Sequence, residues 1–192
     1  MPKVSEAHLE ARRRQILDAA LICFGERGFH ATSMRDICRE AELSAGAVYR
    51  YFESKEDLIA GIAELEIEPL LAMLRDLEPE ARIKAAIHQL FDHPELDQAM
   101  RVEVSLWAEA LTNPRIAELM RAQLEPMTAT VTDAIAELQD SGRIREPSPP
   151  RVIAERLRGG LLGGMLQACV LDEFDLRAYL QSMERSLLGD TD

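Results

Sequence analysis

Apolar residues recur at the spacing of an α-helix along almost the whole chain, and no segment of useful length alternates with the period of two typical of strands. In residues 9–27, for example, Ile16, Ala20 and Phe24 follow one another four residues apart. Such a series places apolar side chains on one face of a helix. The pattern therefore predicts an all-α protein.

Capping residues and prolines indicate where the helices begin and end. Gly28 is expected to end the first helix, and Ser33, Ser44 and Ser54 are each placed to cap a further one. Pro126 falls within a predicted helix and is expected to kink it. We predict about nine helices: three in the first quarter of the chain, and then helices over roughly 55–77, 80–92, 96–112, 115–141, 150–171 and 175–188.

Charge is divided unevenly along the chain. Residues 1–55 carry nine Lys and Arg against eight Asp and Glu, whereas residues 56–192 carry 13 against 26. Only the first part is therefore suited to approach a polyanion such as DNA, despite a net charge of −12. We predict one domain in residues 1–55 and a second domain in residues 56–192, and the motif described below makes the first a helix-turn-helix DNA-binding domain.

The remaining composition excludes several classes of protein. No apolar run approaches the ~18 residues that a membrane-spanning helix needs, and the first residues have no signal-peptide core. The cysteines, Cys23, Cys38 and Cys169, lie far apart, which argues against a disulfide framework or a zinc site and favours a reducing compartment. We expect a soluble cytoplasmic protein with no membrane partner.

The sequence also lacks the motifs of common enzymes. It has no nucleophile elbow, P-loop or dinucleotide fingerprint. Among His88, Asp92 and His93, only the first two share a helical face, so we expect a solvated surface there and not a metal site. We therefore expect no metal, no cofactor and no enzymatic activity.

The segment SMRDICREAELSAGAVYRYFESK, residues 33–55, has the spacing of a helix-turn-helix motif, whose second helix enters the DNA major groove. Small residues at the start of this helix, about 45–51, allow backbone N–H groups to approach phosphates. An ordinary amphipathic helix triplet does not explain why small and basic residues coincide there. The residues that can lock the two helices together are Ile37, Ala41, Leu43, Val48 and Tyr51.

This segment resembles the N-terminal domain of the TetR family of bacterial transcriptional regulators. The resemblance covers residues 12–60 and is carried by G-x-x-x-x-S-M-R-D-I and A-x-L-S-x-G-x-V-Y-x-Y-F-x-S-K-E-D-L. It implies that Ser33 caps its helix at a phosphate, that Arg35 reads a guanine and that Tyr49, Tyr51 and Lys55 hold phosphates. The full set of expected DNA contacts is Ser33, Arg35, Ser44, Ala45, Gly46, Ala47, Tyr49, Arg50, Tyr51 and Lys55.

One position departs from the family pattern. The family usually has glycine in the turn between the two helices, where this chain has Glu42. A residue with a side chain costs roughly 1 kcal/mol in a left-handed conformation, so we expect either a mildly strained residue or a different turn.

The resemblance implies that the acidic remainder binds an effector and forms a homodimer. Four glycines lie within an apolar helix, where each costs about 1 kcal/mol relative to alanine. This cost suggests close approach of another helix, either from a second copy in a four-helix bundle or from the same chain. The predicted dimer interface is Gly159, Gly160, Gly163, Gly164, Leu176, Tyr179, Leu180, Met183 and Leu187.

A second stretch is a candidate for the effector site. Methionines with one aromatic and a few polar groups suit an adaptable pocket, although ordinary core packing accounts for the same residues. The segment LWAEALTNPRIAELMR also resembles the subgroup that contains the choline-responsive regulator of betaine synthesis, which implies a quaternary ammonium on Trp107 near Glu103. The candidate ligand residues are Phe91, Met100, Glu103, Trp107, Leu111, Met120, Gln123 and Met127.

These features together predict a homodimeric regulator, most simply a repressor, that binds double-stranded operator DNA. The two recognition helices would read a palindrome with half-sites spaced by about 34–36 Å or a multiple, and an unidentified small-molecule effector would shift the dimer away from this spacing. Two alternatives stay open at this point. One is a constitutive DNA-binding regulator that acts through a protein partner, and the more remote one is an enzyme that uses the helical pocket.

Overall fold

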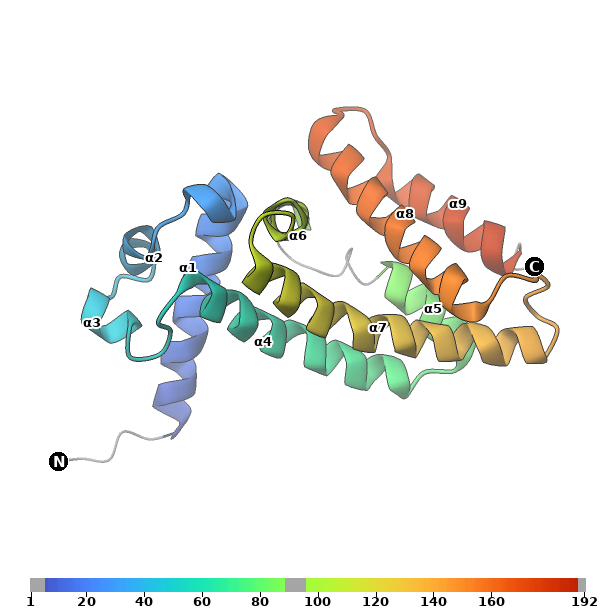
Figure 1. Ribbon diagram of the computed structural model, residues 1–192, viewed down its shortest axis with the longest axis horizontal. Coiled ribbons are helices and arrows are strands. Elements are labelled where there is room, and N and C mark those ends of the chain that lie inside the picture. Colours follow the sequence, from blue (N-terminus) through green and yellow to red (C-terminus); the bar gives the residue numbers. More distant parts are fainter. Residues whose placement is uncertain (1–5, 89–95, 190–192) are drawn as a thin grey trace.

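The computed structural model describes residues 6–88 and 96–189, and the regular structure in these residues is entirely helical (Figure 1). This confirms the all-α prediction. The predicted helix ends that fall on described residues agree within a few residues, except that the second helix of the motif ends at Val48 and not near 51. The predicted end near residue 92 lies outside the described residues. The helices are α1 (Glu6–Ala31), α2 (Met34–Glu40), α3 (Ala45–Val48), α4 (Lys55–Arg75), α5 (Pro79–His88), α6 (Leu96–Ala110), α7 (Pro114–Asp140), α8 (Pro150–Val170) and α9 (Leu176–Leu188).

The predicted caps are formed. The side-chain oxygens of Ser33, Ser44 and Ser54 accept hydrogen bonds from the backbone N–H groups three residues later, at the starts of α2, α3 and α4. At Gly28 the backbone leaves helical geometry, with φ 74° and ψ 163°, although helical turns resume up to Ala31. Helix α7 continues through Pro126. The serine caps and the break at Gly28 therefore set most of the helix ends in the first quarter of the chain.

Figure 1 shows an elongated arrangement in which α1, α2 and α3 gather at one end. The long helices α4 and α7 lie side by side and lead away from this end, while α8 and α9 form an antiparallel pair at the other. Helix α6 crosses close to α1. No helix among residues 6–88 and 96–189 is both long and apolar enough to cross a membrane.

The hydrophobic core has two parts, and α6 contributes to both. Val102 and Leu106 of α6 pack with α1, α2, α3 and the first turns of α4 and α7. Met100, from the same helix, packs with α5, the second half of α7, α8 and α9. The first core therefore combines residues from both sides of residue 55.

Candidate nucleic-acid interface and ligand region

Helices α2 and α3 are held in place by side chains that point into the first core. Ile37 and Val48 are fully buried, and Ala41 is almost so. Leu43 and Tyr51 are half-buried and pack against the same cluster. These five residues lock the two helices at a fixed angle, as their spacing predicted, and leave the opposite face of α3 free.

Of the two outcomes expected for the turn between the helices, the structure has the left-handed residue. Glu42 has φ 53°, in the left-handed region that glycine favours. Its N–H donates to the Arg39 carbonyl oxygen over 3.1 Å, and the Leu43 N–H donates to the Cys38 carbonyl oxygen over 3.0 Å. These two bonds form the Schellman closure of a helix C-terminus. The turn therefore places a residue with a side chain in a left-handed conformation.

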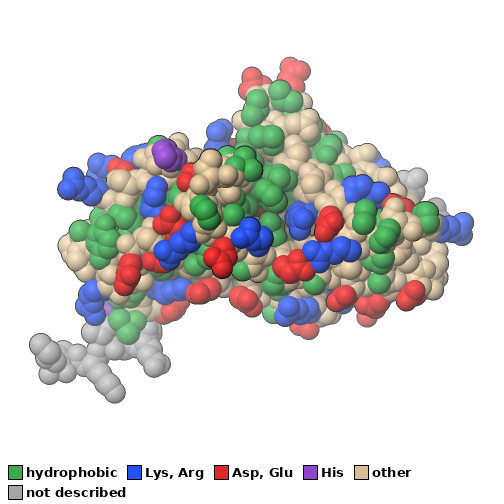
Figure 2. All heavy atoms as spheres, in the orientation of Figure 1, with side chains coloured by type: hydrophobic (Ala, Val, Ile, Leu, Met, Phe, Trp, Pro, Cys, Tyr) green, Lys and Arg blue, Asp and Glu red, His purple; other side chains and the backbone are tan. Residues whose placement is uncertain are grey.

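The free face of the motif carries exposed small and polar residues. Ser44, Ala45 and Gly46 are exposed at the start of α3, Tyr49 and Arg50 are exposed just after it, and Ala47 and Tyr51 are half-buried. Nothing lies within 4 Å of the position that a Cβ atom of Gly46 would occupy. Figure 2 shows several Lys and Arg side chains over this end of the molecule, whereas Asp and Glu occupy the tip between α8 and α9.

The basic residues of this region fall into two groups. Asp36 binds both Arg27, over 2.9 Å, and Arg39, over 2.6 Å. In contrast, Arg35 and Arg50 are exposed, and within the described part of the chain neither forms a hydrogen bond or ion pair. Arg35 and Arg50 are therefore the cations of the motif whose charge is free for another molecule.

Ser33 takes part in a reciprocal cap with Asp36. The Ser33 hydroxyl donates to Asp36 Oδ2 over 2.6 Å, and its oxygen accepts the Asp36 N–H over 3.3 Å. Hydrogen bonds from Ser33, with help from Arg27, lower the pKa of Asp36 to about 2. The Asp36 side chain is therefore ionised at neutral pH, and in this form it caps the start of α2.

Lys55 is engaged within the subunit. Its Nζ donates to the Phe29 carbonyl oxygen over 2.5 Å and lies 4.3 Å from the centroid of the Phe29 ring. Burial lowers the pKa of Lys55. In this conformation Lys55 closes the end of α1, so a phosphate contact would require it to give up these interactions.

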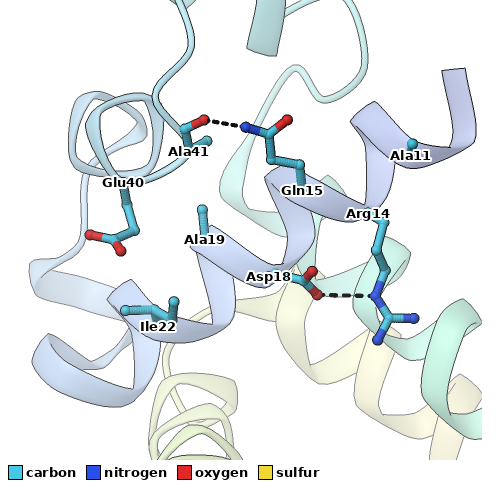
Figure 3. A pocket seen from close by; sticks show the side chains of 8 residues that line it. All are labelled: Ala11, Arg14, Gln15, Asp18, Ala19, Ile22, Glu40 and Ala41. Atoms are coloured by element: carbon cyan, nitrogen blue, oxygen red, sulfur yellow. Dashed lines mark hydrogen bonds and ion pairs between the residues drawn. The ribbon is translucent and has the colours of Figure 1, made fainter. Parts of the chain in front are cut away.

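The predicted ligand residues are not brought together around one cavity. Met100 and Met120 are buried in different cores, and Leu111 is 86% exposed. Gln123 and Met127 are half-buried on α7, and Phe91 lies outside the described residues. An open surface pocket of about 440 Å³ lies between α1 and α2, where the Gln15 side chain donates to the Ala41 carbonyl oxygen over 2.7 Å (Figure 3).

Glu103 and Trp107 do form a pair. Trp107 Nε1 donates a hydrogen bond to Glu103 Oε1 over 2.9 Å. Burial of the carboxyl group raises the pKa of Glu103, although this bond opposes the shift. The described structure gives this carboxylate no cationic partner, so its negative charge is poorly compensated.

The glycines of α8 separate into two pairs that face different neighbours. A Cβ at Gly160 would lie 2.5 Å from Met183 Cε, and one at Gly164 would lie 2.9 Å from Tyr179 ring atoms, so this pair accommodates α9 of the same chain. Gly159 and Gly163 have nothing within 4 Å. The α9 residues Leu176, Leu180 and Leu187 are buried in their own subunit, whereas Tyr179 and Met183 are half-buried.

The other candidate sites are ordinary contacts. His88 Nε2 lies 2.6 Å from Glu184 Oε2, across α5 and α9, while Asp92 and His93 fall outside the described residues. Within the two described ranges, no group of three His, Cys, Asp or Glu is placed to hold a metal ion. Cys23 and Cys38 are buried, and burial raises the pKa of both Cys23 and the half-buried Cys169.

Two family descriptions match the sequence. Residues 16–62 match "Bacterial regulatory proteins, tetR family", and residues 79–189 match "BetI-type transcriptional repressor, C-terminal". Together they cover the helix-turn-helix motif and nearly all of the helices that follow α4.

Individual relatives agree over almost the full length. The chain is 28% identical over 187 residues to the HTH-type transcriptional regulator UidR of Escherichia coli, covering 96% of this chain and 94% of that protein. It is 26% identical over 190 residues to the HTH-type transcriptional repressor Rv1474c of Mycobacterium tuberculosis, covering 97% and 98%. Among solved structures, the SmeT–triclosan complex, from Stenotrophomonas maltophilia, aligns with a TM-score of 0.76 at 26% identity, covering 94% of this chain and 93% of that one.

Proposed function

Because this transcriptional regulator belongs to the TetR family of bacterial regulatory proteins, we propose that it is a homodimeric repressor that leaves a palindromic operator when a small-molecule effector binds. The observation that carries the DNA-binding part is the presence of two free cations, Arg35 and Arg50, beside the exposed, small-residue start of α3. Such a regulator works in the cytoplasm, where bacterial DNA lies.

The proposed DNA contacts divide between phosphates and bases. Backbone N–H groups at the start of α3 approach phosphates, because Gly46 has no side chain that would hold a phosphate away from the backbone. These N–H groups belong to Ser44, Ala45, Gly46 and Ala47. Arg35 reads a guanine through its two-pronged guanidinium group. Additional phosphate contacts are assigned to Ser33, Tyr49, Arg50, Tyr51 and, after it leaves Phe29, Lys55.

A second copy of the chain is the proposed partner of the outward face of α8. Gly159 and Gly163 are open on this face, and Val152, Leu166 and Val170 are exposed apolar residues on the same stripe. Val170 alone is 70% exposed, and apolar stripes of this kind mark interaction sites. The open glycines would allow the helix of a second copy to approach the α8 backbone closely.

The proposed effector is an organic cation held by Glu103 and Trp107. Glu103 is half-buried, and a carboxylate partly removed from water without a cation is costly; a ligand cation both compensates this charge and is attracted to the indole face. Glu103 lies on the helix that contributes to both cores, so a ligand bound there is placed to affect their relative position. The triclosan bound by SmeT supports the general point that a relative of this fold takes small molecules.

DNA binding is tested by selecting a site from random sequence and measuring fluorescence anisotropy across a salt series. Arg50→Ala should reduce the salt slope by about one, and Arg35→Ala should relax the base preference at one position in each half-site. Arg39→Ala is the matched control because Arg39 is already paired with Asp36. Equal, weak binding to selected and random DNA would refute the operator-binding function.

The effector is tested through the fluorescence of Trp107, the single tryptophan of the chain. Choline should shift this fluorescence and release the operator, whereas its neutral analogue 3,3-dimethylbutanol should do neither. Glu103→Gln should abolish the response to choline. Operator binding that no organic cation alters would refute this effector class, and insensitivity to a broad small-molecule screen would favour the constitutive regulator that acts through a protein partner.

A further inference from the structure

Three consecutive residues at the start of α4 contact two other parts of the molecule. Lys55 binds the end of α1 through the Phe29 carbonyl oxygen. Glu56 Oε1 accepts a hydrogen bond from Asn113 Nδ2 over 3.2 Å, and Asp57 Oδ1 accepts one from Arg115 Nη2 over 2.6 Å. Asn113 and Arg115 belong to the start of α7, so the first turns of α4 and α7 are joined directly.

Two of these side chains also cap their own helices. Asp57 Oδ2 accepts the Glu53 N–H over 3.2 Å, while its other oxygen binds Arg115. Asn113 Oδ1 accepts the N–H groups of Arg115 and Ile116, while its amide nitrogen binds Glu56. Each residue thus uses one end of its side chain for a cap and the other for the contact between helices.

We infer that Asn113 and Arg115 are positioning residues that set the orientation of the recognition helix relative to the rest of the subunit. This inference rests on the proposed function, because it assigns a route by which that function is regulated. We name the four residues Glu56, Asp57, Asn113 and Arg115 the α4–α7 joint.

The route from the joint to α3 is short. Only residues 49–54 separate the end of α3 from the start of α4. Leu58 and Ile59, directly after the joint, are buried in the same core as Val48 of α3. The start of α4 therefore moves with α3, and a displacement of the first turn of α7 reaches the DNA-binding surface.

The α4–α7 joint contributes more to the orientation of the recognition helix than to the free energy of unfolding of the subunit. The Asp57 and Arg115 side chains are 31% and 60% exposed, and ion pairs of this kind stabilise folded proteins only weakly. A fixed orientation matters in a dimer, since both recognition helices must meet half-sites at one spacing. Inserting or deleting one base pair turns the second half-site by about 34–36° and moves it by about 3.4 Å.

The test compares the selected operator with versions whose central spacer is one base pair longer or shorter. Wild-type protein should bind both altered versions about tenfold or more weakly, as expected for a dimer of fixed geometry. Arg115→Ala and Asn113→Ala should reduce this discrimination several-fold while binding to the original operator changes less. Arg115→Lys keeps the charge pair with Asp57 and should restore the wild-type discrimination.

Controls separate positioning from charge and from stability. Arg121→Ala removes the same charge from an exposed position on the same helix, away from the joint, and should leave spacer discrimination unchanged. Thermal melting should show that the Arg115 variants remain folded at the assay temperature. Full spacer discrimination in folded Arg115→Ala and Asn113→Ala would overturn the inference, whereas failure of wild-type protein to bind any operator would overturn the proposed function instead.

Discussion

Lys55 Nζ lies 4.3 Å from the centroid of the Phe29 ring and donates a hydrogen bond to the carbonyl oxygen of the same residue. One side chain therefore satisfies a backbone group and covers an aromatic ring directly after Gly28, where α1 loses helical geometry. This contact ties the end of α1 to the start of α4. It also explains why burial, acting against the charged form, lowers the pKa of Lys55.

Lys55→Met should lower the free energy of unfolding by about 1–2 kcal/mol, because it removes a cation–π contact and leaves a carbonyl group with one donor fewer. Urea denaturation measures this loss. Lys84→Met, which removes a lysine paired with Glu80 at the surface, is the control and should cost less. Unchanged stability together with weakened binding to all DNA sequences would favour phosphate binding as the main role of Lys55.

Glu42→Gly should raise the free energy of unfolding by about 1 kcal/mol, since glycine adopts φ 53° without a Cβ penalty. Glu42→Gln is the matched control, because it removes the charge but keeps the strain. Denaturation of both variants in urea distinguishes the two effects. A gain in stability from Gln equal to that from Gly would mean that charge, and not backbone conformation, is the cause.

Glu103→Gln should stabilise the protein at neutral pH and less so in acid. The raised pKa of Glu103 means that the folded state binds the proton more tightly than the unfolded state does. Ionisation of Glu103 therefore destabilises the folded protein above the raised pKa, and this penalty disappears as the pH falls toward the ordinary value. Stability curves at several pH values for Glu103→Gln and for the exposed Glu118→Gln test this, and parallel curves for wild type and Glu103→Gln would contradict it.

Asp36→Asn should destabilise the protein at neutral pH. The pKa of Asp36, about 2 in the folded protein, lies below its ordinary value of 3.8, so the ionised form is favoured by folding. This stabilisation is present above the ordinary value and is lost as the pH falls from 3.8 to about 2. Acid denaturation followed by circular dichroism should therefore show the two proteins converging in that range, with Asp18→Asn as control. A constant gap would point to a role unrelated to ionisation.

The two glycine pairs of α8 should respond differently to alanine. Gly164→Ala places a Cβ 2.9 Å from the Tyr179 ring and should cost about 1–3 kcal/mol of subunit stability. Gly163→Ala has open space and should gain up to about 1 kcal/mol from helix propensity. If α8 pairs with a second copy, the same Gly163→Ala change should weaken the dimer in analytical ultracentrifugation. A dimer unaffected by Gly163→Ala would place the interface elsewhere.

Features specified by neighbouring residues could be predicted from the sequence. The caps at Ser33, Ser44 and Ser54 depend on a hydroxyl and a backbone N–H three residues later, and this relation is visible in the sequence. The positive φ at Glu42 was one of two outcomes expected from the resemblance to a family that usually has glycine at this position. Helix ends and the helix-turn-helix motif belong to this local class.

Features that join distant segments could not be predicted. The Asn-Pro pair at 113–114 is a recognisable helix start, but nothing near it in the sequence identifies Glu56 as the partner of its amide. The side-chain types in this part of the sequence likewise suggested Met100 and Met120 as candidate ligand residues, without indicating that they enter different cores. Leu111 has the right spacing for a buried residue yet lies exposed at the end of α6, because the chain turns there toward α7.

The contribution of α6 to both cores restricts how this protein can be recombined with others. Residues 1–55 carry the whole helix-turn-helix motif. If these residues were separated from the rest of the chain, the apolar surface of α1 that Val102 and Leu106 cover would become exposed to solvent. A chimaera that grafts only these residues onto another regulator would inherit an incomplete core. The transferable unit is the motif together with a matching α6, so altered operator preference in this protein is more readily engineered by exchanging surface residues of α3 than by exchanging domains.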